Sequence, residues 1–125
     1  MNPKTILVVD DEPDLVETVQ FSLETEGYHV LAACNGEDGL NQARKNSPDL
    51  IILDLMLPKL DGYKVCRLLK FDEKYKHIPI LMLTAKAQEK DKLLGKETGA
   101  DDYMTKPFDI DQLMEKVKFH LSKKA

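Results

Sequence analysis

The stretch Asp49-Leu-Ile-Ile-Leu-Asp54, followed by Leu-Met-Leu-Pro58, decides how the rest of the chain is interpreted. Four consecutive apolar residues without polar alternation predict a strand buried on both faces, as in a parallel sheet covered by helices. The strand is expected to end at Asp54. Ligands of open α/β sheets bind at the carboxyl ends of the strands, so this carboxylate is a candidate site residue. A single Asp before Leu-Pro could also serve only to begin a turn.

The chain has 125 residues, the usual length of a domain with a single core, so one domain is expected over residues 1–125. Acidic side chains number 22 against 18 basic ones, giving a net charge of −4. Nucleic acid and anionic membranes are therefore poor candidate partners. The two cysteines, Cys34 and Cys66, are too few for a disulfide framework or a metal knuckle and fit a reducing compartment.

The first apolar run, Ile6 to Val9, is interrupted at once by Asp10-Asp11-Glu12. It is too short for a signal peptide or a membrane-spanning helix. We therefore expect a cytoplasmic protein.

Short apolar runs alternate with amphipathic segments along the chain. Strands are predicted at residues 5–9, 28–33, 50–54, 78–84 and 101–105, the last as an edge strand because it is half polar. Five helices are predicted between and after them, beginning near residues 13, 36, 62, 88 and 110. The helix at about 88–98 has the thinnest apolar face, little more than Leu93 and Leu94, and Gly95 lies inside it.

Five strands alternating with five helices predict a doubly wound, five-stranded parallel sheet, because each connection is too long for a hairpin. The common strand order at this size is 2-1-3-4-5. In that order the winding reverses between the first and third strands, whose ends carry Asp10-Asp11 and Asp54. The sequence thus predicts an acidic cluster at the crevice of the sheet.

Three converging carboxylates repel one another unless a cation lies between them, and Mg²⁺ is the natural choice for oxygen ligands. The fourth strand ends at Thr84, and Lys106 follows the fifth. A hydroxyl and an ammonium are the groups that the oxygens of a transferring phosphoryl group need, with Asp54 as the nucleophile that becomes an acyl phosphate.

Each of these residues alone has a structural alternative. Asp10, Asp11 and Glu12 could cap the first helix, Thr84 could be one more β-branched strand residue, and Lys106 a solvated charge. Their occurrence at successive strand ends on one rim favours the chemical interpretation.

These motifs, together with Asp61-Gly62, Leu83-Thr84-Ala85, Gly99 to Tyr103 and Lys106-Pro107-Phe108, resemble the receiver domain of two-component response regulators, the CheY-like family with a flavodoxin-like sheet. The resemblance extends from the first strand to the last helix. It implies that a sensor histidine kinase or a histidine phosphotransfer protein transfers a phosphoryl group to Asp54 with Mg²⁺ bound. It also implies that the chain is not an enzyme with a separate substrate, because it catalyses only its own phosphorylation and dephosphorylation.

The resemblance further implies a role for each matching residue. The metal would be held directly by Asp11, Asp54 and the backbone carbonyl of Met56, and through water by Asp10. Thr84 and Lys106 would contact the phosphoryl oxygens, and the Lys106–Pro107 bond is expected to be cis.

A switch is implied as well. The Thr84 hydroxyl would move toward the phosphoryl group and Tyr103 would turn inward, altering the face made by the fourth helix, fifth strand and fifth helix. That face would control a downstream protein target or output domain, and could mediate a phosphorylation-dependent homodimer. Tyr103 alone could equally be an ordinary amphipathic edge residue. Met56 and Lys86 flank the path of the hydrolytic water, and we expect them to slow dephosphorylation.

Other classes of protein remain as alternatives. A phosphatase with an aspartyl nucleophile typically has a second Asp where this chain has Met56. A flavodoxin-like cofactor binder would have a phosphate loop rich in Ser, Thr and Gly in place of Asp10-Asp11-Glu12. A receiver used only for protein binding would usually lack Asp54, Thr84 or Lys106. The sequence allows both a free-standing receiver and a part of a longer regulator.

Overall fold

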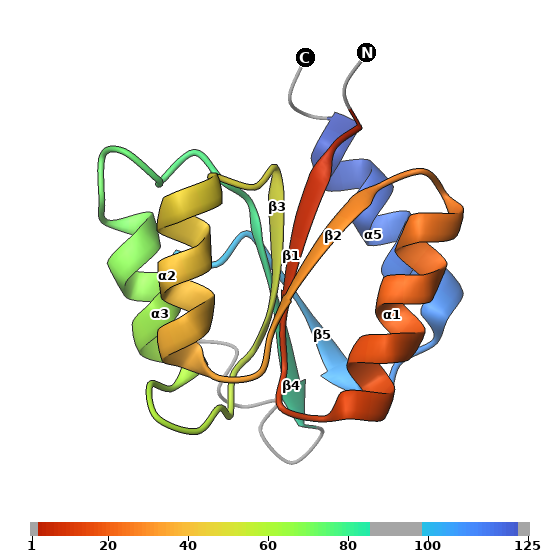
Figure 1. The fold of residues 1–125 in the computed structure, drawn as a ribbon, viewed down its shortest axis with the longest axis horizontal. Helices are drawn as coiled ribbons and strands as arrows, with labels where there is room; N and C mark the ends of the chain where they lie inside the picture. Colours follow the sequence, from red (N-terminus) through yellow and green to blue (C-terminus); the bar gives the residue numbers. More distant parts are fainter. Residues whose placement is uncertain (1–2, 86–98, 123–125) are drawn as a thin grey trace.

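The computed structural model in Figure 1 describes residues 3–85 and 99–122. Its strands are β1 (Thr5–Val9), β2 (His29–Ala33), β3 (Leu50–Asp54), β4 (Ile80–Ala85) and β5 (Asp102–Lys106). The helices within these residues are α1 (Pro13–Thr25), α2 (Gly36–Asn46), α3 (Gly62–Lys70) and α5 (Ile110–Ser122). The predicted fourth helix, at about 88–98, falls outside the described residues, so four of the five predicted helices are seen.

All five strands are parallel and form one sheet in the order β2-β1-β3-β4-β5, which confirms the predicted topology. Helices α2 and α3 cover one face, and α1 and α5 cover the other (Figure 1). β1 and β3 are neighbours, with Ile6 opposite Leu50, and β5 is an edge strand as expected. The carboxyl ends of β1, β3, β4 and β5 therefore meet at one end of the sheet.

The core consists of two apolar clusters, one on each face of the sheet. Alternate residues of β1 and β3 point to opposite faces, so that Leu7 and Ile51 pack with α2 and α3, whereas Ile6 and Leu50 pack with α1 and α5. Every residue of β3 is buried, as its unbroken apolar run predicts. Asp54 ends this strand and is itself buried.

The helices begin at residues suited to that position. Pro13 is in the first turn of α1, where its missing N–H is not needed. Asn35 caps α2 by accepting from the Asp38 N–H at 2.8 Å, and Asp61 caps α3 by accepting from the Lys64 N–H at 2.9 Å.

Gly62 lies directly against the backbone that follows β3. Its N–H donates to the carbonyl oxygen of Leu55 at 3.0 Å, and a Cβ atom at this position would collide with the carbonyl oxygen of Asp54. Glycine permits this close approach. The start of α3 is thereby fixed against the segment that carries Asp54.

Three strands, β2, β4 and β5, differ by one or two residues from their predicted bounds, and β2 begins at His29 instead of Tyr28. β4 begins at Ile80 instead of Ile78, because the Ile78 N–H still bonds the Tyr75 carbonyl in a turn and Pro79 has no N–H for the ladder. β5 ends at Lys106, which pairs with Ala85 in the sheet. Lys106 is thus held in the ladder itself.

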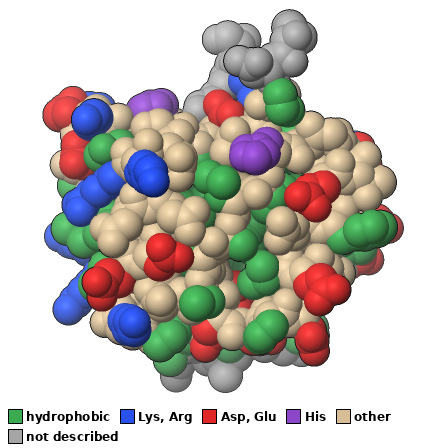
Figure 2. Space-filling view, in the orientation of Figure 1, with side chains coloured by type: hydrophobic (Ala, Val, Ile, Leu, Met, Phe, Trp, Pro, Cys, Tyr) green, Lys and Arg blue, Asp and Glu red, His purple; other side chains and the backbone are tan. Residues whose placement is uncertain are grey.

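Charge is distributed unevenly over the surface. Figure 2 shows Lys and Arg side chains gathered on the side of α2 and α3, where Asp and Glu side chains also lie, whereas the charged side chains visible over the side of α1 are Asp and Glu. The last turns of α2 and α3 are basic, and that of α1 has no basic residue. In the part of the chain that is described, no helix has the length and apolarity needed to cross a membrane.

Candidate functional site

Three carboxylates meet at the carboxyl end of the sheet. Asp10 and Asp11 follow β1, and Asp54 is the last residue of the adjacent β3. One oxygen from each lies within 4.8 Å of the others. Asp10 and Asp54 are buried, and Asp11 is exposed. The predicted acidic cluster is therefore present and has one side open to solvent.

The two buried carboxylates are oriented by the backbone next to them. Asp10 Oδ1 accepts from the Glu12 N–H at 2.9 Å, and Asp54 Oδ1 accepts from the Met56 N–H at 3.1 Å. Each bond spans two residues, the pattern of an Asx turn. The same bonds leave the Oδ2 atoms of Asp10 and Asp54 for other partners.

Lys106 supplies the positive charge of this cluster. Its Nζ lies 2.8 Å from Asp10 Oδ2, 3.0 Å from Glu12 Oε1 and 3.3 Å from Asp54 Oδ2. The Lys106–Pro107 bond is cis, as the resemblance implied. The end of β5 thus places the ammonium among the carboxylates, as the positions of the strand ends predicted.

The Glu12 contact was missed by sequence reasoning, which considered this residue only as a possible helix cap. Glu12 occupies the N-cap position of α1, but its side chain makes no capping hydrogen bond. No local pattern signals its partner, because Lys106 is 94 residues away.

The electrostatics of the site follow from burial and neighbouring charge. Burial and the nearby Asp10 charge raise the pKa of Asp54, and Lys106 only partly opposes this rise. Burial would lower the pKa of Lys106, but hydrogen bonds to Asp10 and Glu12 and the charge of Asp54 raise it instead. Lys106 therefore stays charged at physiological pH.

The donor set fits a divalent cation. Among the residues that the structure describes, Asp10, Asp11 and Asp54 face one ammonium, so these four groups carry an excess of two negative charges when all are ionised. Carboxylate oxygens are the ligands of hard cations such as Mg²⁺, which is often held by one or two carboxylates together with waters and a phosphate.

Thr84 lies next to this cluster, near the end of β4. Asp54 pairs with Leu83 in the sheet, so Thr84 is one residue further toward the carboxyl end. The Thr84 hydroxyl is buried and has no hydrogen-bond partner among the described residues. A buried hydroxyl without a partner is unusual, and this one is available to a ligand oxygen.

The structure says less about three other predicted site residues, Met56, Tyr103 and Lys86. Met56 is 61% exposed, and metal binding by its carbonyl remains a prediction. Tyr103 is half-buried and packs against the core beneath α2 and α3. Lys86 lies outside the described residues.

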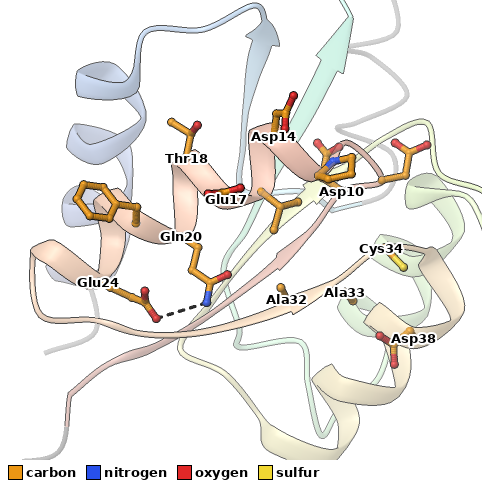
Figure 3. A pocket seen from close by; sticks show the side chains of 14 residues that line it. Asp10, Asp14, Glu17, Thr18, Gln20, Glu24, Ala32, Ala33, Cys34 and Asp38 are labelled. Carbon is orange, nitrogen blue, oxygen red and sulfur yellow. Dashed lines mark hydrogen bonds between the residues drawn. The ribbon is translucent and has the colours of Figure 1, made fainter.

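A groove of about 970 Å³ runs from the site along α1 and β2 (Figure 3). It begins at Asp10 and Asp11, and six of its lining side chains are carboxylates, the others being Asp14, Glu17, Glu24 and Asp38. The open side of the carboxylate cluster is therefore reached through an acidic surface.

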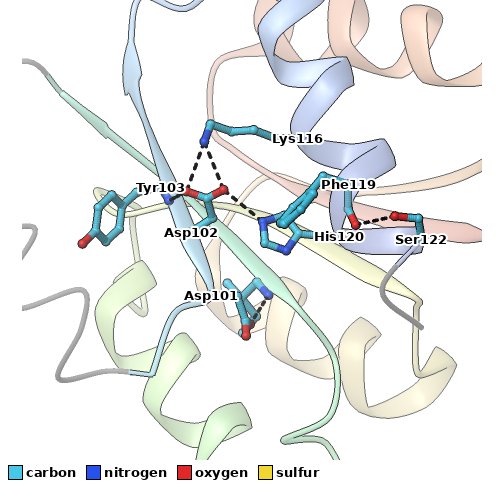
Figure 4. A network of polar contacts seen from close by, with 8 residues as sticks. Asp101, Asp102, Tyr103, Lys116, Phe119, His120 and Ser122 are labelled. Carbon is cyan, nitrogen blue, oxygen red and sulfur yellow. Dashed lines mark hydrogen bonds and ion pairs between the residues drawn. The ribbon is translucent and has the colours of Figure 1, made fainter. Parts of the chain in front are cut away.

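A second polar network lies at the amino end of β5, at the opposite end of this strand from Lys106 (Figure 4). The Asp102 carboxylate accepts from Lys116 Nζ at 3.0 and 3.2 Å and contacts His120 Nε2 at 3.0 Å. Burial would raise the pKa of Asp102, but the bonds from His120 and Lys116 lower it. The sequence reasoning missed this network, although the four-residue spacing of Lys116 and His120 on one helix was a usable signal.

Comparison with known proteins agrees with this geometry. A family model described as "Response regulator receiver domain" matches residues 6–118. The chain belongs to this family. The phosphoacceptor role is generic to receiver domains, which fits the carboxylate cluster and lysine described above.

Two curated relatives of this receiver domain are transcriptional regulators. The alkaline phosphatase synthesis transcriptional regulatory protein PhoP of Bacillus subtilis is 54% identical over 92% of the chain. The DNA-binding dual master transcriptional regulator RpaA of Synechocystis is 49% identical over 90%. The receiver domain spans 47% of each, about half the length of these relatives.

Among solved structures, the chemotaxis response regulator CheY4 of Vibrio cholerae is similar in fold and sequence. It superimposes with a TM-score of 0.89 at 31% identity, covering 95% of the receiver domain and 99% of CheY4.

Proposed function

We propose that this receiver domain accepts a phosphoryl group on Asp54 from a sensor histidine kinase or a histidine phosphotransfer protein. The observation that carries the proposal is the Asp54 carboxylate at a strand end, with the Lys106 ammonium 3.3 Å from Oδ2. An Asp54 oxygen attacks phosphorus, a P–O bond forms, and the P–N bond of phosphohistidine breaks. Its electron pair returns to the imidazole, which leaves neutral when its other nitrogen carries a proton.

The neighbouring residues support this transfer. Lys106 would contact phosphoryl oxygens, and the unpartnered Thr84 hydroxyl would donate to another. Asp11, Asp54 and the Met56 carbonyl would hold Mg²⁺ directly, and Asp10 through water. When bound, Mg²⁺ would neutralise the excess carboxylate charge together with that of the phosphoryl oxygens.

Phosphorylation would be read out at the face of the predicted fourth helix, β5 and α5. Thr84 and Tyr103 are the proposed switch residues, and Met56 and Lys86 are the proposed determinants of the lifetime of the phosphorylated form. The names of PhoP and RpaA describe transcriptional regulators, so an output domain is a plausible recipient of the signal, and a homodimer through this face is another. A single domain over residues 1–125 and a cytoplasmic location remain predictions from the sequence.

The test is intact mass after incubation with acetyl phosphate and Mg²⁺. We expect one added phosphoryl group in the parent protein, and none in Asp54→Asn or after chelation of the metal. Asp14→Asn is a matched control, because Asp14 is an exposed carboxylate on α1 outside the cluster.

Two outcomes would contradict the proposal. An adduct that persists in folded Asp54→Asn would place the acceptor elsewhere. If neither acetyl phosphate nor a kinase donor gives an adduct in the folded parent protein, a receiver used only for protein binding becomes the better interpretation.

A further inference from the structure

We propose that Glu12 is a positioning residue that holds the Lys106 ammonium back from the phosphoryl group. This inference rests on the proposed function of Asp54. It adds a residue that limits how readily the Lys106 ammonium contacts the phosphoryl group. The Glu12 carboxylate is the only partner of Lys106, among the described residues, that lies outside the cluster of Asp10, Asp11 and Asp54.

The start of α1 directs Glu12 toward Lys106. The Glu12 N–H donates to Asp10 Oδ1 at 2.9 Å, and its carbonyl oxygen accepts from the Val16 N–H at 3.1 Å, so the backbone of Glu12 is fixed on both sides. An N-cap side chain usually accepts from the first turn of its own helix. That of Glu12 makes no such bond and instead reaches Lys106 Nζ at 3.0 Å.

The three contacts of the ammonium are unequal. Lys106 Nζ is closest to Asp10 at 2.8 Å, next to Glu12 at 3.0 Å and furthest from Asp54 at 3.3 Å. An ammonium has three donors. Glu12 and Asp54 each accept a hydrogen bond from Lys106, and Asp10 forms the closest ion pair with it. The contacts with Asp10 and Glu12 therefore compete with phosphoryl oxygens on Asp54 for the ammonium.

Burial determines which contact is released. The Asp10 side chain is fully buried, so water cannot take the place of the ammonium there and this contact is the costlier one to lose. The Glu12 side chain is 61% exposed, so water can replace the ammonium there with little loss. Glu12 is therefore the partner that Lys106 leaves, and its carboxylate competes with the phosphoryl group until then.

The experiment compares initial rates of phosphorylation by acetyl phosphate at saturating Mg²⁺, followed by intact mass. Glu12→Gln removes the competing charge and is expected to raise the rate, by up to about fivefold, the range of an exposed ion pair. Glu115→Gln is the matched control, because Glu115 is an exposed carboxylate of α5 outside both the acidic groove and the partners of Lys106. It is expected to leave the rate unchanged.

Glu12→Asp separates position from charge. It keeps the negative charge but shortens the side chain by one methylene, so its carboxylate no longer reaches Lys106. If Glu12 acts by holding Lys106, this variant is accelerated like Glu12→Gln. A rate equal to that of the parent would show that only charge matters and would overturn the inference.

A rate in Glu12→Gln at or below that of the parent would also overturn it, provided that the urea unfolding midpoints of the two proteins agree. In both cases the parent protein still accumulates a phosphoryl group that requires Asp54. Failure of the proposed function gives a different result, namely no adduct in the parent or in any variant.

Discussion

Thr84 is a buried polar residue near the carboxyl end of β4. Its side chain is buried between β4 and its neighbours, and it has no hydrogen-bond partner among the described residues. In the unfolded chain, water bonds the same hydroxyl, so folding leaves it without a partner at a cost of about 1–3 kcal/mol. Under the proposed function, a phosphoryl oxygen would become the partner of this hydroxyl.

We predict that Thr84→Val increases the free energy of unfolding by about 1 kcal/mol, because a methyl group replaces an unpaired hydroxyl. The same variant is expected to be phosphorylated more slowly by acetyl phosphate. Urea unfolding followed by circular dichroism checks the first effect, and intact mass the second.

Thr25→Val is a useful comparison, because the Thr25 hydroxyl donates to the Phe21 carbonyl oxygen at 2.8 Å. That variant is not expected to gain stability. If Thr84→Val instead unfolds at lower urea concentration than the parent, the hydroxyl has a partner that the geometry does not show.

At the scale of elements, β5 and α5 are joined by Asp102. Its carboxylate accepts from Lys116 and contacts His120, both on α5 (Figure 4). A lowered pKa in the folded state means that the ionised carboxylate is stabilised there more than in the unfolded chain. This contribution is complete above the ordinary carboxyl value of 3.8 and is lost as the pH falls through the lower, folded-state pKa.

We predict that Asp102→Asn lowers the free energy of unfolding by about 1–3 kcal/mol at pH 5, because the amide cannot replace the carboxylate in its charge-assisted hydrogen bonds. The difference from the parent should narrow between pH 4 and pH 2.5. Urea unfolding at a series of pH values measures both effects.

Glu115→Gln controls for the loss of a negative charge on this face, because Glu115 is an exposed residue of α5. Its effect should stay within about 0.5 kcal/mol. A difference for Asp102→Asn that is independent of pH down to 2.5 would mean that its charge does not join the two elements.

At the scale of the whole molecule, the repulsion among the carboxylates couples metal binding to folding. The unfolded chain separates Asp10, Asp11 and Asp54, so a cation that needs all three binds only the folded protein. We predict that Mg²⁺ raises the melting temperature of the unphosphorylated protein. The stabilisation should reach about 2.7 kcal/mol at one hundred times the dissociation constant.

Asp11→Asn should reduce this stabilisation by Mg²⁺, whereas Asp38→Asn, elsewhere in the same acidic groove, should retain it. Sodium chloride at matched ionic strength provides the reference for screening. Equal stabilisation by sodium and magnesium salts would contradict a specific metal site.

Much of the fold and site was predictable because it follows from local patterns. The unbroken apolar run before Asp54 identified a central strand, and the order of strands then brought Asp10, Thr84 and Lys106 to the same edge. What could not be predicted depends on side chains from distant elements. Glu12 and Asp102 resemble ordinary surface acids in the sequence, and only the packed fold shows that each contacts a specific lysine.

The site joins parts of the chain that are far apart in sequence, since Lys106 contacts Asp54 across 52 residues and Glu12 across 94. The chain is synthesised from its N-terminus onward, so Asp10 and Asp54 have left the ribosome well before β5 is made. Contacts of such long range form late, because the entropy of closing the loop must be overcome first. Under the proposed function, a nascent or truncated chain without β5 would lack Lys106 and would not be phosphorylated efficiently by a kinase. Phosphorylation would then be restricted to chains whose fold is complete.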